Sequence, residues 1–328
     1  MQIIHNSWMH IIRENSCGCG VDCLWQADFD KKARIDLIVI MAHMHTKPER
    51  QFPEQVLAFL ELEPPIHGSF GADARHAKLK GFDWKITYER DSDLLMSYAP
   101  TRFNFDAYNH TERRTEYLAL LMVSNCKDGD RLQYVAELMK HIPVLSLGKC
   151  LNNMPNGTTT ASLFPRCAGV AAGNDWSENK LCIMSYFKYH LAFENSRYDD
   201  YVTEKLFDSF NTPSLPIYRG SGTARELMPA LHSAIMADDF ASPKALAEYI
   251  WQLENNTNLY NEYFAWKAQY RAGVPLLPAF LHLQAYNRDS FQCNACRKLR
   301  TFLAHFDYSS HTAVARSADN ATNTSVHR

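Results

Sequence analysis

The stretch YHLAFENSRYDDYVTEKL, residues 189–206, decides the fold. Its opening residues are apolar or aromatic apart from His190, and they predict a buried strand over residues 189–193. A short polar loop follows, and we expect a helix over residues 201–210. A strand that passes through a loop into a helix is a βα unit, the repeat from which parallel sheets are built.

Similar units occur on both sides of this stretch. Strand-like runs alternate with amphipathic helices through most of the chain, which is the pattern of an α/β protein. Ser242 followed by Pro243 is a strong helix start, because a capping side chain precedes proline at the first helical position. The predicted strands are 35–41, 56–62, 118–124, 143–147, 189–193, 215–218 and 233–236, and the predicted helices are one after residue 130, 201–210, 242–254 and 258–267.

The bulk composition is that of a globular protein and argues against several functions. Hydrophobic residues make up 46% of the chain and charged residues 21%, as in folded domains. The net charge is −2 and no basic run occurs, so we expect no nucleic-acid partner. No apolar run reaches the length of a membrane span. No P-loop or G-x-S-x-G motif is present, which argues against P-loop kinases and serine hydrolases.

Nine cysteines bear on the compartment of the protein. Cys17, Cys19 and Cys23 cluster near the start, while Cys293 and Cys296 form a C-x-x-C near the end. Such clusters anchor disulfides in a secreted protein and bind zinc in a cytosolic one, and the spacing leaves both interpretations open. N-x-S/T sequons fit a lumenal chain and occur at Asn109, Asn156, Asn255, Asn320 and Asn323.

The loop and helix after residue 193 carry a dense set of polar side chains. Lys205 lies about one turn inside the predicted helix, where an ammonium group, backbone N–H groups and the helix dipole can converge on an anion. Glu204 beside it can accept hydrogen bonds from the hydroxyl groups of a ribose or a sugar. The same pair also fits an ordinary surface helix, and the spacing alone does not decide between these interpretations.

The motifs HLAFENS and DYVTEK resemble the signature of the α1,3/4-fucosyltransferases, glycosyltransferase family 10. Further family motifs are matched in the same order by LPIYRG at 215–220, SPKALAEY at 242–249 and YNEYFAWK at 260–267. Pro229 with residues 233–235 and 238–240 matches another. The resemblance covers roughly residues 37–296 and is strongest from Arg131 onward.

This resemblance implies an α/β fold of the GT-B type, with two Rossmann-like domains facing a central cleft. Residues 1–112 would form the acceptor-side domain and residues 113–306 the GDP-fucose-binding domain, followed by a disordered tail over 307–328. The implied reaction moves L-fucose from GDP-fucose to the 3-hydroxyl of GlcNAc in a glycan or glycoprotein, with inversion. The alternative is a catalytically inactive relative that binds a glycan or a GDP-sugar.

The resemblance also assigns the residues of the donor site. Arg131 and Lys205 match the family's cationic contacts to the GDP diphosphate, where they would stabilise the leaving group. Tyr201 and Glu204 match residues that contact the nucleotide. Glu194 and Asn195 would line the donor site at the end of the strand.

The acceptor side offers one candidate for the general base. Leu62-Glu63-Pro64-Pro65 resembles the family element that carries this glutamate, so Glu63 is the predicted catalytic residue. Glu61 is a rival, because strand alternation would point it and Glu63 to the same face. The acceptor itself stays open between the core GlcNAc of an N-glycan and a terminal lactosamine.

The resemblance implies no required cofactor. Asp91 and Asp93 also form a D-x-D motif, through which Mn²⁺ would at most stimulate the reaction. We interpret the pair as structural, because cationic side chains already account for the phosphates. The family implies a Golgi lumenal enzyme with a type II membrane anchor, a segment that this sequence lacks, and oxidised Cys293 and Cys296. Residues 209–214 and 221–225 depart from the family pattern near the donor site and would lower activity or alter its geometry.

Overall fold

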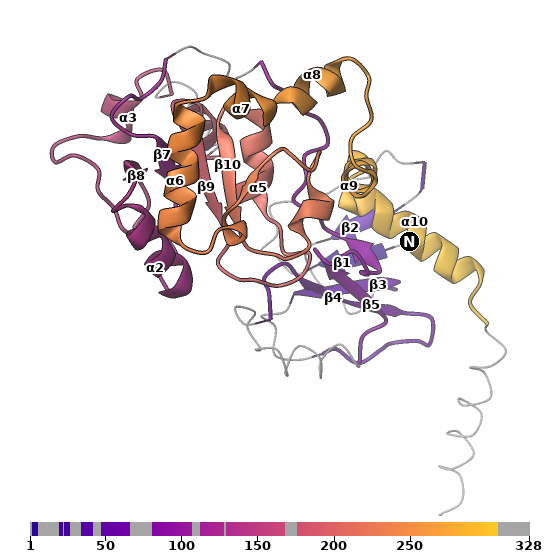
Figure 1. Cartoon of the computed structure of the whole chain (residues 1–328). Helices are drawn as coiled ribbons and strands as arrows, with labels where there is room; N and C mark the ends of the chain where they lie inside the picture. The colour runs from indigo at the N-terminus through magenta and orange to yellow at the C-terminus, as the bar shows by residue number, and fades with distance from the viewer. Residues whose placement is uncertain are drawn as a thin grey trace, which may run out of the picture. The chain divides into compact units, whose positions relative to one another are not determined.

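The computed structural model describes residues 2–5, 20–21, 23–26, 34–41, 47–65, 81–106, 112–127, 129–167 and 176–307 (Figure 1). The chain forms two compact units, one of Met1–Met96 with Asp289–Arg328 and one of Ser97–Arg288. The expected boundary lay after residue 112, whereas the first unit here ends at Met96. Residues 289–306, expected in the second domain, belong to the first unit. The predicted disordered tail lies outside the described residues beyond Asp307.

The first unit is built on a parallel six-stranded sheet with the order β2-β1-β3-β4-β5-β6. A C-terminal helix, α10 (Phe291–Ala304), packs on this sheet because its buried Cys296 and Leu299 share a core with Trp25 and Leu37. This packing explains why the chain returns to the first unit. The strands are β1 (Gln2–His5), β2 (Leu24–Gln26), β3 (Leu37–Met41), β4 (Val56–Glu61), β5 (Trp84–Thr87) and β6 (Leu94–Leu95).

The second unit has a parallel five-stranded sheet with the order β11-β10-β9-β7-β8. Its strands are buried on both faces, as in doubly wound folds, where helices cover each side. The strands are β7 (Ala119–Leu121), β8 (Val144–Ser146), β9 (Tyr189–Phe193), β10 (Leu215–Arg219) and β11 (Ile235–Met236).

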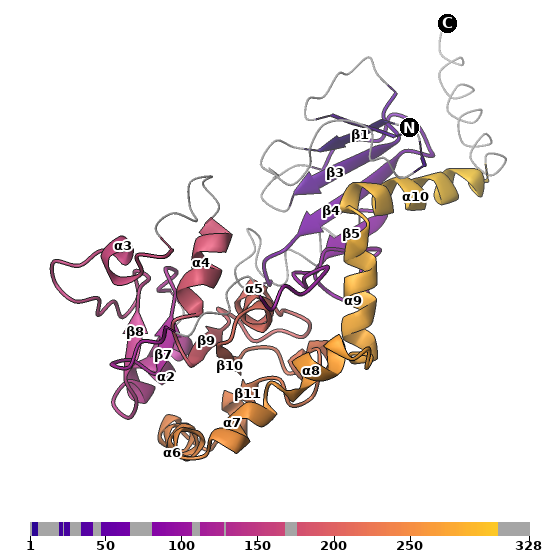
Figure 2. The ribbon, with the colours of Figure 1, turned by 90° about the horizontal axis from the view of Figure 1, so that it is seen from above.

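Alternate residues of these strands pack against different helices. Leu121 and Leu191 face α2 (Gly129–Leu138) and α6 (Pro243–Glu254), which lie together over one side of the sheet (Figure 1). Leu120 and Leu145 face the other side, where they pack with Ile183 of α4 (Trp176–Met184). The remaining helices of the unit are α3 (Thr160–Leu163), α5 (Glu204–Phe207), α7 (Thr257–Glu262), α8 (Ala265–Arg271) and α9 (Pro278–Arg288), as Figure 2 shows from above.

Several predicted elements are confirmed and others are shorter than expected. The strand over residues 189–193 has the predicted bounds, and Ser242 caps α6 by accepting from Ala245 N at 3.2 Å. The predicted helix over 201–210 is wrong in its start, because Thr203 is the N-cap and α5 begins at Glu204. A 3-10 turn, Asp208–Asn211, then completes it. The helix predicted over 258–267 is divided between α7 and α8.

Three disulfides stabilise the described part of the chain. Cys23–Cys296 joins the two distant segments of the first unit, and Cys126–Cys150 and Cys167–Cys182 lie in the second. Because Cys23 and Cys296 are joined in a disulfide, these two residues are not zinc ligands in this structure. Among the described residues no group of His, Cys, Asp and Glu side chains could hold a metal ion. Cys17 and Cys19 lie outside the described residues. No helix in the described ranges is both long enough and apolar enough to cross a bilayer.

The strand order of the second sheet creates a switch point between β7 and β9. The chain runs from β7 to β8 on one side and then continues with β9 on the other side of β7. Ligands of doubly wound sheets bind at such a point, beyond the carboxyl ends of the strands. The loops after β7 and β9 are therefore the first place to look for a site.

Candidate functional site

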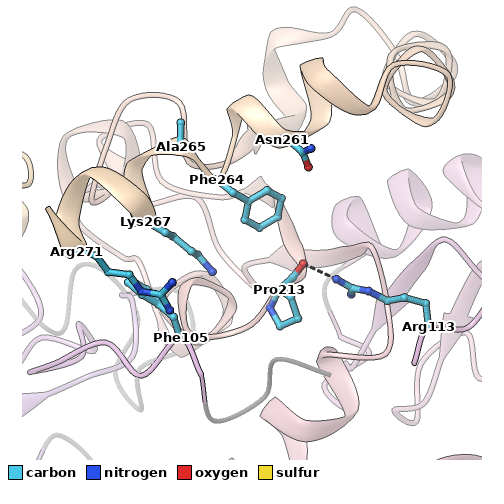
Figure 3. Close-up of a pocket in the computed structure, with 8 residues that line it drawn as sticks. All are labelled: Phe105, Arg113, Pro213, Asn261, Phe264, Ala265, Lys267 and Arg271. Carbon is cyan, nitrogen blue, oxygen red and sulfur yellow. Dashed lines mark hydrogen bonds between the residues drawn. The ribbon is translucent and has the colours of Figure 1, made fainter. Parts of the chain in front are cut away.

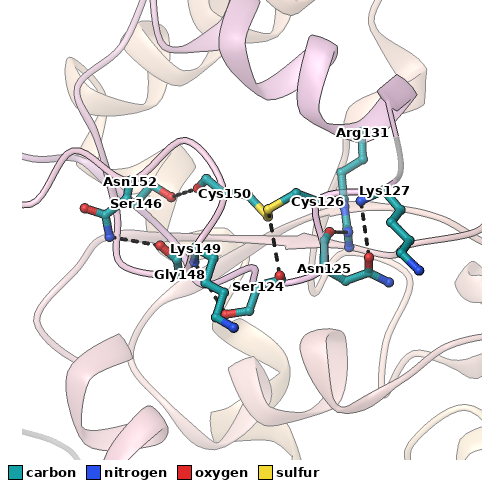
Figure 4. Close-up of a disulfide and its surroundings, with 10 residues drawn as sticks. All are labelled: Ser124, Asn125, Cys126, Lys127, Arg131, Ser146, Gly148, Lys149, Cys150 and Asn152. Carbon is teal, nitrogen blue, oxygen red and sulfur yellow. Dashed lines mark hydrogen bonds between the residues drawn. A yellow bond between two sulfur atoms is a disulfide. The ribbon is translucent and has the colours of Figure 1, made fainter.

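Arg131 lies at the switch point between β7 and β9. It belongs to the first turn of α2 and is buried. Its Nη2 donates to Asn125 O at 2.7 Å, and its Nη1 donates to Phe193 O at 3.3 Å (Figure 4 shows the first of these). Because Asn125 follows β7 and Phe193 ends β9, the guanidinium bridges the two strand ends. An arginine in this place can bind an oxyanion at the carboxyl edge of the sheet.

Arg219 holds the start of α2 and was not among the predicted site residues. It ends β10, and its guanidinium donates to both carboxylate oxygens of Asp130 at 2.9 and 3.2 Å. It also donates to Asp238 at 3.2 Å and lies 4.6 Å from the centre of the Tyr134 ring. Since Asp130 directly precedes Arg131, these contacts fix the helix turn that carries the buried arginine. The signal in the sequence was an arginine at the end of an otherwise apolar strand.

Glu194, Thr203 and Lys205 form a buried network at the end of β9. The Glu194 carboxylate accepts from Thr203 N at 2.8 Å and from Thr203 Oγ1 at 2.9 Å. Lys205 Nζ lies 3.1 Å from Glu194 Oε2 and 2.9 Å from Thr203 Oγ1. It also lies 3.4 Å from Glu204 Oε1. Side chains at the end of β9, at the N-cap and at the start of α5 therefore fix the ammonium by direct contacts. The expected contribution of a helix dipole is small, because α5 is only four residues long.

The electrostatics of this network keep Lys205 charged. Burial lowers its pKa, but the carboxylates of Glu194 and Glu204 outweigh this effect and the pKa is raised. Burial raises the pKa of Glu194 even though the ammonium opposes it. The Arg131 guanidinium acts on Lys205 in the opposite sense and lowers its pKa, so the two cations lie within electrostatic range of each other. Two neighbouring cations of this kind can bind one anionic group.

The other predicted donor-site residues lie on the loop after β9 and at the start of α5. Asn195 is half-buried directly after Glu194. Tyr201 is buried, and its carbonyl accepts from the Tyr218 hydroxyl at 3.4 Å, so its ring belongs to the packed interior. The pKa of Glu204 is lowered, because the nearby ammonium groups outweigh its burial. All six predicted donor residues therefore belong to the carboxyl edge of one sheet.

The segment 221–225, which departs from the family pattern, stabilises this loop. Thr223 Oγ1 donates to Asp200 Oδ1 at 3.0 Å and accepts from Asp200 N at 2.8 Å. Asp200 has a φ of 59°, in the left-handed region that L-residues rarely adopt. The hydrogen bonds from Thr223 offset the cost of that conformation.

A cavity of about 630 Å³ lies beside the switch point. The disulfide Cys126–Cys150 links the loops that follow β7 and β8 (Figure 4). Gly148 is required there, because a Cβ atom would lie 1.9 Å from Val123 O. The cavity is lined by Ser124, Leu147, Gly148, Lys149, Asn152 and Thr160, among others. Its hydroxyl, amide and ammonium groups suit a polar ligand.

Glu63 lies in the first unit and is exposed, beyond the end of β4. Its N–H donates to Glu61 Oε1 at 2.9 Å, so the Glu61 carboxylate turns back onto the loop. Because β4 ends at Glu61, the strand alternation that made the two glutamates equivalent does not extend to Glu63.

Asp91 and Asp93 both contact lysines in the first unit. Asp91 pairs with Lys85 Nζ at 2.5 Å. Asp93 accepts from Lys85 N at 2.8 Å and lies 3.6 Å from Lys298 Nζ. These contacts support a structural role for the D-x-D pair.

Comparison with known proteins identifies the family. The model of glycosyltransferase family 10 (fucosyltransferase), C-terminal part, matches residues 111–314. The chain belongs to this family. The predicted enzyme class, a family 10 fucosyltransferase, is thereby confirmed. The matched range includes all six predicted donor residues.

Similar sequences are fucosyltransferases of plants and insects. An Alpha-(1,4)-fucosyltransferase of Arabidopsis thaliana is 30% identical over 300 residues, which are 89% of this chain and 70% of the plant protein. Glycoprotein 3-alpha-L-fucosyltransferase A of Drosophila melanogaster is 33% identical over 265 residues, 76% of this chain and 48% of the fly protein. The chain thus spans about half the length of the fly relative.

Solved structures show the same fold. A crystal structure of an α1,3-fucosyltransferase with GDP has a TM-score of 0.55 and 14% identity, covering 93% of this chain and 91% of its own. A crystal structure with GDP-fucose has a TM-score of 0.52 and 15% identity, covering 88% and 90%. The predicted α/β fold of the GT-B type is confirmed.

Proposed function

We propose that this fucosyltransferase moves L-fucose from GDP-fucose to the 3-hydroxyl of an N-acetylglucosamine residue in a glycan, with inversion at the anomeric carbon. The observation that carries the proposal is the pair of cations at the switch point, the buried Arg131 and the half-buried Lys205. Their placement at the carboxyl edge suits a nucleotide diphosphate.

Arg131 and Lys205 would bind the diphosphate and stabilise the charge that develops on GDP as it leaves. Glu204 and Asn195 would hold the ribose or the sugar, and Glu194 would act through Lys205 by fixing the ammonium. Tyr201 would shape the loop from the interior. The cavity beside the switch point offers room for the guanosine.

Glu63 would serve as the general base. A carboxylate deprotonates the incoming hydroxyl while the bond to GDP breaks on the opposite side of the sugar. The proposed reaction requires Glu63 to act at one face of the fucose while Arg131 and Lys205 hold the diphosphate at the other. The exposed position of Glu63 allows it to meet an acceptor hydroxyl.

No cofactor is required in this proposal, because cationic side chains supply the charge that a metal ion would bring. Mn²⁺ would at most stimulate transfer. Fucose transfer should therefore persist after treatment with EDTA, and a complete loss that Mn²⁺ restores would contradict this part of the proposal.

Three disulfides favour an oxidising compartment for the enzyme. We therefore assign its action to the secretory pathway and its acceptor to glycoprotein glycans in the Golgi lumen. The fly relative, named as a glycoprotein fucosyltransferase, supports this class of acceptor.

The decisive experiment incubates the purified protein with GDP-fucose and two acceptors, an N-glycan core and a terminal lactosamine. We expect a mass gain of one deoxyhexose on one of them, with an α1,3 linkage in the NMR spectrum of the product. An α1,4 linkage, as in the name of the plant relative, would overturn the proposed regiochemistry. Binding of GDP-fucose without transfer would favour an inactive binding protein.

A further inference from the structure

A second cavity of Ser97–Arg288 lies at the amino edge of the same sheet. It has a volume of about 370 Å³ and is lined by Arg113, Pro213 and side chains of α7 and α8 (Figure 3). Arg113 precedes β7 and Pro213 precedes β10. All strands of the sheet are parallel, so their starts share one edge. A five-residue strand spans about 16 Å, which separates this cavity from the candidate donor site.

Three cationic side chains line the cavity. Arg271 pairs with Asp106 at 2.7 Å. Arg113 donates to the carbonyl oxygens of Ser185, Phe187 and Pro213, at distances of 3.0, 2.5 and 3.1 Å. Lys267 Nζ donates to Thr212 O at 2.6 Å. Within the described ranges, neither Arg113 nor Lys267 has a carboxylate at ion-pair distance.

Carbonyl oxygens accept these hydrogen bonds but leave the positive charge in place. The effect is visible at Lys267, where burial, Arg271 and Arg113 together lower the pKa to about 7. The protein therefore holds a cation in a site that disfavours its charge. An oxyanion in the cavity would remove that penalty, since both cations keep N–H groups beyond those that the carbonyls use.

Most of the remaining lining is apolar or aromatic, and Asn261 adds one amide side chain. Phe264 and Pro213 lie between Lys267 on one side and Arg113 on the other, while Phe105 lies beside Arg271 (Figure 3). The Lys267 ammonium lies 5.0 Å from the Phe105 ring centre and 5.3 Å from that of Phe264. Such walls suit the apolar face of a ring, while the cations fix its charged substituent.

We propose that this pocket binds an oxyanion carried on a sugar ring, such as a sulfate ester of a glycan. The cations recognise the oxyanion and the aromatic walls hold the ring. The site is distinct from the candidate donor site, because the two lie at opposite edges of the same sheet.

Isothermal titration of the full chain tests the proposal with glucose 6-sulfate, inorganic sulfate and glucose at constant ionic strength in chloride. We expect glucose 6-sulfate to bind at least about tenfold more tightly than inorganic sulfate, and glucose not to bind measurably. Equal affinity for the two sulfates would overturn the sugar assignment. Equal affinity for glucose 6-sulfate and glucose would overturn the oxyanion site.

Matched variants locate the binding. Lys267→Gln keeps a donor for Thr212 O but removes the charge, and should weaken glucose 6-sulfate binding at least about tenfold, or roughly 1.4 kcal/mol. Lys244→Gln, at an exposed position of α6, should leave it unchanged. Lys205→Met should also leave it unchanged. A loss in Lys205→Met with wild-type binding in Lys267→Gln would place the anion at the donor site and overturn the proposal.

Proton uptake gives a readout that a structural role would not change. Binding should raise the pKa of Lys267, so titrations at pH 7.5 in buffers of different ionisation enthalpy should show protons taken up. Arg271 and Arg113 act directly on the charge of Lys267, while Asp106 pairs with Arg271 and Tyr260 acts on Arg113. Lys267 has a pKa of about 7, so its ammonium titrates near neutrality. Lys267→Gln should abolish the uptake, and unchanged uptake in that variant would overturn the assignment.

Discussion

Replacing Lys205 by methionine separates two roles of the ammonium, as counterion of Glu194 and as ligand of the diphosphate. The substitution leaves Glu194, whose side chain is 0% exposed, without the cation 3.1 Å from its Oε2. Breaking a buried pair in this way costs about 3–5 kcal/mol. Because the lysine side chain is itself 22% exposed, solvent screening should reduce the loss below that range, to about 2–3 kcal/mol in the free energy of unfolding.

The loss should depend on pH in a defined direction. Burial already raises the pKa of Glu194, and without the ammonium that pKa rises further. A carboxyl group with a raised folded pKa contributes stability at low pH that is lost as the pH rises through that pKa. The deficit of Lys205→Met relative to wild type should therefore be small near pH 4 and grow toward pH 7.5. Urea unfolding at both pH values measures it.

The double variant Glu194→Gln/Lys205→Met completes the design. A neutral amide needs no counterion, so the double variant should recover most of the stability. Fucose transfer should stay lower by about 10²–10³ in kcat/KM, because the cation at the diphosphate is still missing. Lys180→Met, which breaks the 2.8 Å pair with Asp208, is the matched control and should lose stability but keep transfer. Recovery of both stability and transfer in the double variant would refute a role for Lys205 in donor binding.

Three further outcomes are expected. Glu63→Gln should abolish transfer while the affinity for GDP, measured by titration, stays within about threefold of wild type; unchanged turnover would remove Glu63 as the base. Arg219→Leu should release Asp130 and raise KM for GDP-fucose about tenfold with a smaller change in kcat, and a wild-type KM would show that Arg131 is held without it. Burial lowers the pKa of His190 to about 3, so the neutral imidazole contributes stability above pH 6.5, and this stability is lost as the pH falls, at about 1.4 kcal/mol per pH unit. In urea unfolding, His190→Asn should flatten the decline of the free energy of unfolding between pH 6.5 and 4.5. An unchanged slope would contradict this assignment.

The parallel sheet of the second unit could be predicted because its strands are mostly apolar, with few polar residues such as His190 and Arg219. Residues 189–193 gave the correct bounds, since Glu194 is the first ionisable residue after a buried run. The helix after it was predicted too early, because Tyr201 and Val202 are apolar and continue the helical pattern. Their side chains instead fill the interior, and the Thr203 hydroxyl sets the helix start.

Other features depend on contacts between distant residues. Arg219 was missed because its partner Asp130 lies 89 positions away, and no local pattern links them. The disulfide Cys126–Cys150 joins residues that follow neighbouring strands, which becomes evident only when β7 and β8 pair. The return of α10 to the first unit could not be predicted, because in sequence α10 resembles a continuation of the preceding helices.

The first unit is interrupted by the whole of Ser97–Arg288, and this has a consequence for biosynthesis. At ribosomal rates of about 5–20 residues per second, the intervening 192 positions take roughly 10–40 s to translate. During that interval Cys23 exists as a thiol beside Cys17 and Cys19, before Cys296 has been made. The nascent chain thus needs either a delay in oxidation or an isomerase that exchanges early bonds, while the inserted unit can complete its own sheet first.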